Sequence, residues 1–453
     1  MSLAMRARTP FLHRDADVKS SSISRHFTKF LCKLICILCI TASLPINSAL
    51  ASISLLSQSA KLVPSDGGGT EYDLGWETAT SNNGSVIAVS MPGDDSVTSN
   101  QGSVLVYRKN ATTGTYTQVQ KLEASDGASG DVFGHALDIS PDGVDIIVGA
   151  RGDDTSTGSV YVFRENPSTG VWSQVKKLVS NDAETYDYAA DAISIYENRI
   201  AVGVSSDNTV GGNDAGAVYI YNRSCTTCDD WEQSGRVFAS DGADTDYFGR
   251  SVVLKGDTLV VGAFYKDYGG SSNTGAVYVF TSDANGVFTE TQKLMGSVNN
   301  ADDNFGTDKM ALQDDILAIG AYTDEQTQKS GSVYIFRKNS SNLWTEETRL
   351  FASDAAQDDY FGVALDISGS YLVVGSQYDD DGGSDEGSAY VFKLTSSGTW
   401  QEAFKLTAAD ASGSSRFGHW VNINDQTVVA GAWYHNSRVG AAYVFTLPRL
   451  ANS

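Results

Sequence analysis

Basic residues are scarce in this chain. Its 453 residues include 32 Lys and Arg against 55 Asp and Glu, which gives a formal net charge of −23. An acidic surface repels nucleic acid and anionic membranes, so neither is expected as a partner. The surplus of carboxylates suits cations or basic partners, and it equally suits a solvated surface that only keeps the protein soluble.

Histidine is also scarce, and the common catalytic motifs are missing. After residue 51 the chain holds His135, His419 and His435, and it contains no His-Glu-x-x-His, Gly-x-Ser-x-Gly or Walker sequence. These motifs mark zinc proteases, α/β-hydrolases and P-loop proteins, so the sequence favours a protein that is not an enzyme. Because aspartate is abundant, a carboxylate pair for glycosidic cleavage stays open, although no spacing selects one.

No apolar run is long enough for a membrane-spanning helix, which needs ~20 residues. Residues 34–44 are apolar, follow seven basic residues and precede Ala49-Leu50-Ala51, a small-x-small cleavage pattern. This order predicts a signal peptide over residues 1–51 and a secreted protein without an integral membrane segment. The alternative is an uncleaved signal anchor at the cell surface.

Cysteine is rare outside that segment. Only Cys225 and Cys228 remain after residue 51, and in an oxidising compartment this pair predicts a small loop disulfide. Four Asn-x-Ser/Thr sequons agree with a secreted glycoprotein. They are Asn83, Asn110, Asn222 and Asn339.

Glycine is plentiful, with 44 residues, and the chain is built from seven copies of one repeat. A Phe-Gly pair opens most copies, with Leu74-Gly75 in the first and Ala189-Ala190 in the third. The other pairs are Phe133-Gly134, Phe248-Gly249, Phe305-Gly306, Phe361-Gly362 and Phe417-Gly418. Copies of roughly sixty residues with turn-rich borders are typical of propellers and related repeat folds.

Each copy contains four short segments rich in Val, Ile, Tyr and Phe, which predicts β-strands. The second segment is apolar throughout, as in Ile147-Val148-Gly149-Ala150, so both of its faces should be buried. The third reads Gly-x-Val-Tyr-Val-Phe, as at Gly275 to Phe280. The fourth begins with an aromatic residue and ends in a basic-apolar pair, as at Trp400 to Leu406.

The fourth segments are offset from the other three. One precedes the first copy, ending at Leu62, and none follows the seventh third segment, which ends at Phe445. We therefore predict an all-β, seven-bladed propeller with four-stranded blades, closed by the N-terminal strand of the mature chain. The predicted domains are the signal peptide (1–51), the propeller (52–446) and a short tail (447–453).

The Phe-Gly, Val-Gly-Ala and Gly-Ala-Val-Tyr-Val-Phe motifs resemble the FG-GAP repeat of integrin α subunits, over about residues 52 to 446. The resemblance implies a propeller that acts in adhesion or ligand binding. It also implies calcium in Asp-x-Asp-x-Asp-Gly loops between the first and second strands. The corresponding loops here, such as Ser140-Pro141-Asp142-Gly143, are short and lack that spacing.

Acidic loops recur elsewhere in each copy. The richest stretch supplies the candidate Ca²⁺ ligands Asp379, Asp380, Asp381 and Asp385. The alternative is that these aspartates cap turns by accepting hydrogen bonds from nearby backbone. Arg151-Gly152-Asp153 is a tripeptide that integrins can bind, and chance together with turn chemistry also accounts for it.

One position in each copy, directly after Phe-Gly, varies while its neighbours stay uniform. In a propeller this position should ring one mouth of the central channel, as a binding site or as a solvated rim. It holds Val363 in the sixth copy and, in the others, the candidate binding residues Trp76, His135, Asp191, Arg250, Thr307 and His419. The sequence thus favours a monomeric, extracellular binding propeller for a protein or glycan partner. Alternatives are a glycan-active enzyme at the channel mouth and an acidic wall or matrix component.

Overall fold

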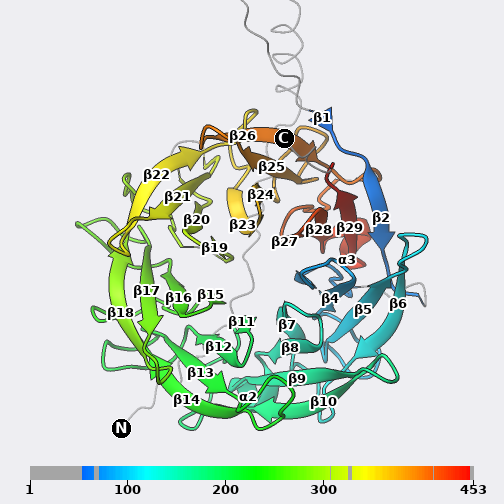
Figure 1. Ribbon diagram of the computed structural model, residues 1–453, viewed down its shortest axis with the longest axis horizontal. Helices are drawn as coiled ribbons and strands as arrows, with labels where there is room; N and C mark the ends of the chain where they lie inside the picture. The colour runs from blue at the N-terminus through cyan, green and yellow to red at the C-terminus, as the bar shows by residue number, and fades with distance from the viewer. Residues whose placement is uncertain (1–53, 66–70, 307, 325–328, 412, 449–453) are drawn as a thin grey trace, which may run out of the picture. The chain divides into compact units, whose positions relative to one another are not determined.

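The computed structural model describes residues 54–65, 71–306, 308–324, 329–411 and 413–448. The strands form seven antiparallel sheets arranged in a ring, so the predicted seven-bladed propeller is confirmed (Figure 1). The expected signal segment and the mouth residue Thr307 lie outside the described residues. Within these ranges, no helix is long and apolar enough to cross a membrane.

The blades follow the chain in order, and each runs from the channel outward. The first three contain β3 (Thr78–Thr80), β4 (Val86–Met91), β5 (Ser103–Lys109) and β6 (Tyr116–Leu122); β7 (Phe133–Ile139), β8 (Asp145–Ala150), β9 (Ser159–Asn166) and β10 (Val171–Leu178); and β11 (Ala192–Tyr196), β12 (Arg199–Val204), β13 (Ala217–Asn222) and β14 (Glu232–Val237). The next three contain β15 (Ser251–Lys255), β16 (Thr258–Ala263), β17 (Ala276–Ser282) and β18 (Phe288–Leu294); β19 (Ala311–Gln313), β20 (Ile316–Ala321), β21 (Ser332–Lys338) and β22 (Trp344–Leu350); and β23 (Phe361–Ser368), β24 (Tyr371–Ser376), β25 (Ser388–Leu394) and β26 (Trp400–Leu406).

The seventh blade joins the two ends of the described chain. It contains β27 (Val421–Asn424), β28 (Thr427–Ala432), β29 (Ala441–Thr446) and, on the outside, β2 (Gln58–Leu62). β2 pairs antiparallel with β29, with Leu62 opposite Ala442, so the predicted closure by the N-terminal strand is confirmed. The two-residue strand β1 (Ser54–Leu55), which was not predicted, pairs parallel with β26 of the sixth blade.

The phenylalanine of each Phe-Gly pair is a core residue. Phe133 is fully buried, and its ring meets those of Tyr161 and Phe163 edge-on, with centroids 5.6 and 5.9 Å apart. Phe248, Phe305, Phe361 and Phe417 make the same pair of contacts in their own blades. Such pairs add about 1 kcal/mol each beyond the burial of their area. The first and third motifs of the repeat therefore build one aromatic cluster in each of these five blades.

The glycines of the repeat allow neighbouring blades to approach closely. Gly306 has a φ of 94°, which L-residues with a side chain rarely adopt, and a Cβ on Gly262 would collide with the Gly306 carbonyl of the next blade. The turn at the Phe-Gly glycine interrupts the extended chain. As a result, five inner strands begin after this pair. The inner strands β7 and β23 include the pair, and each shows a register shift there against the second strand of its blade.

His435 lies beside the closing strand and should make its stability depend on pH. It is buried; its Nε2 lies 3.0 Å from Lys61 Nζ and 3.8 Å from Asp410 Oδ2, and its Nδ1 lies 3.2 Å from Ser415 Oγ. The Tyr443 ring stands perpendicular to the imidazole. Burial, and then the charge of Lys61, lowers the pKa of His435 against an opposing contribution from Asp410.

A histidine whose folded pKa is lowered resists protonation in the folded state. The unfolded chain takes up that proton below about pH 6.5. The contribution of His435 to the free energy of unfolding is therefore fully present above this pH and declines below it, by up to about 1.4 kcal/mol per pH unit. Thermal melts between pH 7 and pH 5.5 should show a smaller loss of melting temperature for His435→Asn than for the wild type. Parallel curves for the two proteins would contradict this assignment.

Candidate functional site at the channel mouth

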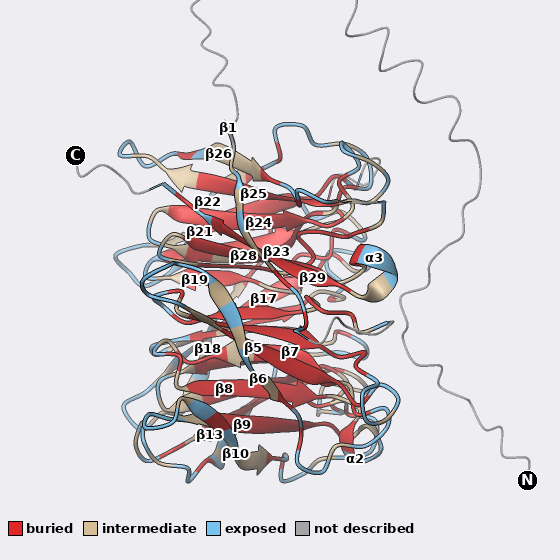
Figure 2. Ribbon diagram, turned by 90° about the vertical axis from the view of Figure 1, so that its right-hand side faces the viewer, coloured by how far each residue is buried: buried red, intermediate tan, exposed pale blue. Residues whose placement is uncertain are grey.

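The two ends of the ring differ in the length of their loops. One end, the hairpin face, carries the tight turns between first and second strands and between third and fourth strands, such as 256–257 and 339–343. The opposite end, the long-loop face, carries the longer connections, such as 205–216 and 238–250. Single helical turns α2 (Asp153–Ser156) and α3 (His435–Arg438) lie on it, on the same side of the ring in Figure 2. Long loops on a rigid scaffold are the usual carriers of function.

The described mouth residues begin the inner strands at the long-loop face. His135, Asp191 and His419 are buried, whereas Trp76 and Arg250 are half-buried. Trp76 lies between the two histidines, with ring centroids 6.0 Å from His135 and 5.0 Å from His419. Arg250 Nη1 lies 3.6 Å from Asp191 Oδ1. The structure thus places the predicted set in an aromatic group and a charged group.

Arg151, which was not predicted as a mouth residue, connects the two groups. Its Nη1 lies 3.1 Å from His135 Nε2 and 3.5 Å from Asp191 Oδ1. Its guanidinium also stacks on Tyr188 at 4.9 Å from the ring centroid. Burial alone would raise the pKa of Asp191, but the charges of Arg151 and Arg250 outweigh burial and lower it. Asp191 is therefore an ionised carboxylate between two guanidinium groups.

His135 lies beside Arg151 but, unlike Arg151 and Asp191, it carries no charge. Burial lowers its pKa well below the ordinary histidine value, and the nearby Arg151 lowers it further. At neutral pH its imidazole is neutral, so it contributes a hydrogen-bonding ring and no positive charge to the mouth.

An aromatic wall completes the opposite side of the mouth. Trp433 meets Trp76 with centroids 5.4 Å apart, and Arg416 stacks over Trp433 at 5.1 Å. Arg416 Nη1 donates to the Tyr378 hydroxyl at 2.9 Å. Tyr360 then links Tyr378 to Tyr322. We call the whole set the mouth ring: Trp76, His135, Arg151, Asp191, Arg250, Asp308, Tyr322, Tyr360, Tyr378, Arg416, His419 and Trp433.

Sequence reasoning missed seven of the twelve residues of this ring because it followed only the position after Phe-Gly. Arg151, Tyr322 and Trp433 come directly after the second strands, and Tyr360 and Arg416 come directly before Phe-Gly. Both positions vary between copies in the same way as the position after Phe-Gly. A comparison of variable positions that flank the uniform motifs would have found them.

Six segments of the chain match the family model of the FG-GAP repeat, at residues 116–163, 172–221, 231–280, 288–336, 344–392 and 400–445. The chain belongs to the FG-GAP repeat family. Each matched FG-GAP repeat begins at the outer strand of one blade and ends at the third strand of the next. The copy that carries Leu74-Gly75 in place of Phe-Gly lies outside these matches.

No curated protein matches the sequence. The periplasmic gluconolactonase PpgL of Pseudomonas aeruginosa is 14% identical, covers 74% of this chain and 86% of its own, and has a TM-score of 0.48. Sqt1 of Saccharomyces cerevisiae is 12% identical, covers 87% of this chain and 100% of its own, and has a TM-score of 0.47. Likenesses this distant carry no functional argument.

The acidic loops of the FG-GAP repeats are neutralised from within the propeller. Lys177 Nζ lies 2.8 Å from Asp126 and 2.7 Å from Asp153, and it sits over the Tyr161 ring. A basic residue near the end of every outer strand pairs with acidic loops in this way: Lys61, Lys121, Lys177, Arg236, Lys293, Arg349 and Lys405. The recurrent aspartates thus have a structural partner in each blade.

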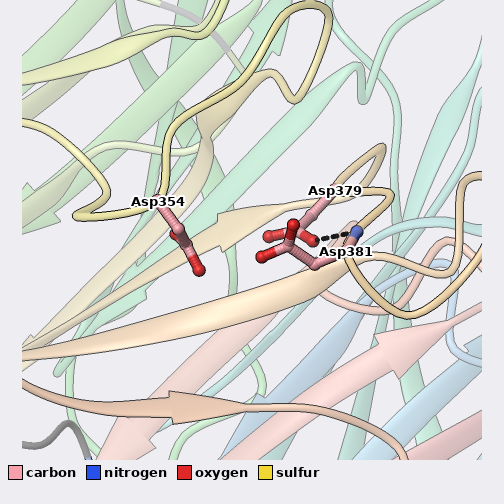
Figure 3. Close-up of side chains that lie close together, drawn as sticks. All are labelled: Asp354, Asp379 and Asp381. Carbon is pink, nitrogen blue, oxygen red and sulfur yellow. Dashed lines mark hydrogen bonds between the residues drawn. The ribbon is translucent and has the colours of Figure 1, made fainter. Parts of the chain in front are cut away.

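The predicted calcium ligands show the same arrangement. Carboxylate oxygens of Asp354, Asp379 and Asp381 lie within 4.8 Å of one another (Figure 3). Lys405 Nζ lies 2.7, 2.8 and 3.1 Å from them, respectively, and Tyr390 donates to Asp354 and Asp379. Asp380 and Asp385 are not part of this converging group. The Lys405 ammonium group thus neutralises the carboxylates that a calcium ion would need, and calcium binding at this group stays a prediction.

Replacement of this lysine should create calcium sensitivity. In Lys405→Met, the three carboxylates lose their counter-charge, and we expect a loss of about 3 kcal/mol in the free energy of unfolding. Millimolar Ca²⁺ should then raise the melting temperature of the variant and leave the wild type unchanged. Lys255→Met, at the exposed end of β15, is the control that should behave as wild type. A wild-type protein that calcium stabilises as strongly as the variant would instead support calcium binding by the native loops.

The tripeptide Arg151-Gly152-Asp153 is not displayed as an adhesion loop. Arg151 belongs to the mouth ring, and Asp153 is buried beside Lys177.

The Cys225–Cys228 pair forms a disulfide with its Cα atoms 5.1 Å apart, in the loop between β13 and β14. This loop belongs to the hairpin face.

Proposed function

We propose that this FG-GAP propeller is an extracellular, non-enzymatic binding protein that presents its long-loop face to a protein or glycan partner. The mouth ring carries the proposal, because it concentrates varied aromatic and charged side chains on a rigid, uniform scaffold. Aromatic and arginine residues are the side chains that most often anchor binding partners.

The positions of the four sequons support the choice of face. Asn83 lies in the turn between β3 and β4, and Asn110, Asn222 and Asn339 lie at the turns between third and fourth strands. All four therefore belong to the hairpin face. If these sites carry glycans, the hairpin face is shielded and the long-loop face is left accessible.

Exposed apolar side chains lie at loop tips on both faces, with Val287 and Leu343 on the hairpin face, but the most exposed of the described ones lies on the long-loop face. Val210 is 93% exposed in the loop after β12, and Val97 and Tyr268 are exposed in the equivalent loops of two other blades. Exposed apolar groups of this kind are common at interaction surfaces. The proposed extracellular location rests on the sequons and on the expected signal segment, residues 1–51.

Two matched substitutions test the choice of face. Val210→Thr completes a sequon at Asn208 on the long-loop face, and Val287→Thr completes one at Asn285 on the hairpin face. Both proteins would be produced in a glycosylating host and tested for retention on immobilised cellulose, xylan, mannan, chitin, ovalbumin and mucin. We expect the wild type to be retained by at least one of these probes, a tenfold loss for Val210→Thr and none for Val287→Thr. Equal losses for the two variants, or no retention of the wild type, would overturn the proposal.

A propeller enzyme is the second candidate, and the central channel favours it. A cavity of about 350 Å³ is lined by residues that include Glu77, Asp138 and Lys309. Burial raises the pKa of Glu77 well above its ordinary value and that of Asp138 to about 6. A protonated carboxyl group beside an ionised one is the requirement for glycoside cleavage. Release of reducing sugar from the polysaccharides named above, lost in Glu77→Gln, would favour the enzyme.

A further inference from the structure

We infer that the mouth ring binds one neutral pyranose unit, with the sugar between its aromatic wall and its charged side. This inference rests on the proposed binding function and specifies the ligand. A pyranose has an apolar face of C–H groups and a rim of hydroxyls, so it requires an aromatic surface next to strong hydrogen-bonding groups. The mouth ring offers both kinds of group on opposite sides.

The aromatic side is formed by two tryptophans from adjacent blades. Trp76 and Trp433 lie 5.4 Å apart with an interplanar angle of 67°, which leaves one indole face and one indole edge next to each other. The electron-rich face of an indole attracts the weakly positive C–H groups of a sugar. Trp433 Nε1 is buried and has no hydrogen-bond partner in the part of the chain that is described. A buried donor of this kind needs an acceptor, which a sugar oxygen supplies.

The charged side is formed by Arg151, Asp191 and Arg250. Asp191 Oδ1 is buried and lies 3.5 Å from Arg151 and 3.6 Å from Arg250, and it accepts no hydrogen bond from any described residue. The second oxygen, Oδ2, accepts from Ser205. A hydroxyl group donates a hydrogen bond and accepts others at the same oxygen. One hydroxyl can thus donate to Asp191 Oδ1, and its neighbour can accept from a guanidinium group.

The charges of this side balance, which argues for a neutral sugar. Arg151 and Arg250 are paired with Asp191 and Asp308, the latter 3.6 Å from Arg250 Nη2. A uronic acid on this side would place a carboxylate close to Asp191 and Asp308, where both arginines are already paired. The third arginine of the mouth ring, Arg416, stacks on Trp433 on the aromatic side. The mouth ring offers one pair of tryptophans and one carboxylate between two guanidinium groups. These groups suffice for one ring and its hydroxyls, so a single terminal unit is the expected ligand.

Titration of the secreted protein with methyl glycosides tests the inference. The probes are the methyl pyranosides of glucose, galactose, mannose and N-acetylglucosamine, with methyl glucuronoside as the charged comparison, followed by tryptophan fluorescence and calorimetry. We expect saturable binding of at least one neutral glycoside and at least tenfold weaker binding of the glucuronoside. Asp191→Asn should weaken binding at least tenfold, and Trp433→Phe at least threefold.

Trp400→Phe is the matched control, because Trp400 lies on an outer strand and its indole N–H also lacks a described partner. It should bind as the wild type does. Melting curves identify any variant that fails to fold, and Trp433→Phe decides the outcome if Asp191→Asn is one of them. Absence of neutral-glycoside binding by the folded wild type, tighter binding of the glucuronoside, or equal effects of Trp433→Phe and Trp400→Phe would overturn the inference. Retention on the polysaccharide or glycoprotein probes that persists in both mouth variants would overturn the sugar site and leave the proposed function standing.

Discussion

A chain that lacks residues 52–62 is expected to lose its folded monomer. This deletion removes β2, whose Leu62 is buried in a cluster with Leu105 and Val444. It also leaves the whole edge of β29 without its hydrogen-bonding partner. An unpaired edge in a ring of blades is a template for association with other chains. Circular dichroism melts and size-exclusion chromatography should show a lower melting temperature and oligomers.

Two milder changes separate the contributions to this closure. Deletion of residues 52–55 removes β1, a two-residue strand, and keeps Leu56, which packs against the core. It should cost about 1 kcal/mol or less because few hydrogen bonds are lost. Leu62→Ala leaves the strand in place and empties its buried position, which should cost about 3 kcal/mol. If the protein without residues 52–62 melted as the complete one does, β2 would not close the ring in solution.

Asp145→Asn is expected to destabilise the propeller by about 3 to 5 kcal/mol, because it leaves buried arginines without their shared counter-ion. Asp145 is buried at the start of β8, where its carboxylate accepts from Arg164 Nε at 2.8 Å and from Arg223 Nη1 at 2.7 Å. Arg223 comes from the neighbouring blade and is itself buried, and it stacks on Trp231 of its own blade at 4.5 Å. Urea unfolding of the variant and the wild type measures the difference.

Asp229→Asn provides a control that involves the same arginine. Asp229 is exposed and pairs with Arg164 Nη1 at 2.5 Å, and an exposed ion pair contributes about 1 kcal/mol or less. The two substitutions remove the same charge from the same partner and differ in burial. Similar losses from both would mean that burial does not determine the strength of this network.

Much of the fold could be predicted because the packing and turns of each blade require particular residue types at fixed places in the repeat. The glycines mark close contacts between blades, the alternating aromatics of the third strand mark its packing, and the fourth segment at Leu62 marks the closure. These features recur at one spacing, so the strands predicted in one copy support the strands predicted in the others. The short β1 strand escaped prediction because two residues carry no periodicity.

The site could be predicted only in part. The position after Phe-Gly was found because it varies between uniform neighbours, but Arg151, Trp433 and Arg416 lie in loops, where no regular spacing indicates which way a side chain points. The lysine partners of the acidic loops were visible as basic-apolar pairs at the ends of outer strands. Their pairing with aspartates from neighbouring loops depends on tertiary packing, as Lys405 with Asp354 shows.

The two strands that close the ring, β2 and β29, are made at very different times during synthesis. Ser59 in β2 bonds to Val444, 385 residues further along the chain. At about 5–20 residues per second, a ribosome needs on the order of tens of seconds to make that partner. The leading strand must therefore wait unpaired until β29 has been made, so the ring can close only when synthesis of the chain is nearly complete. A nascent chain that stops early cannot complete the mouth of the channel, so binding itself would report that translation has finished.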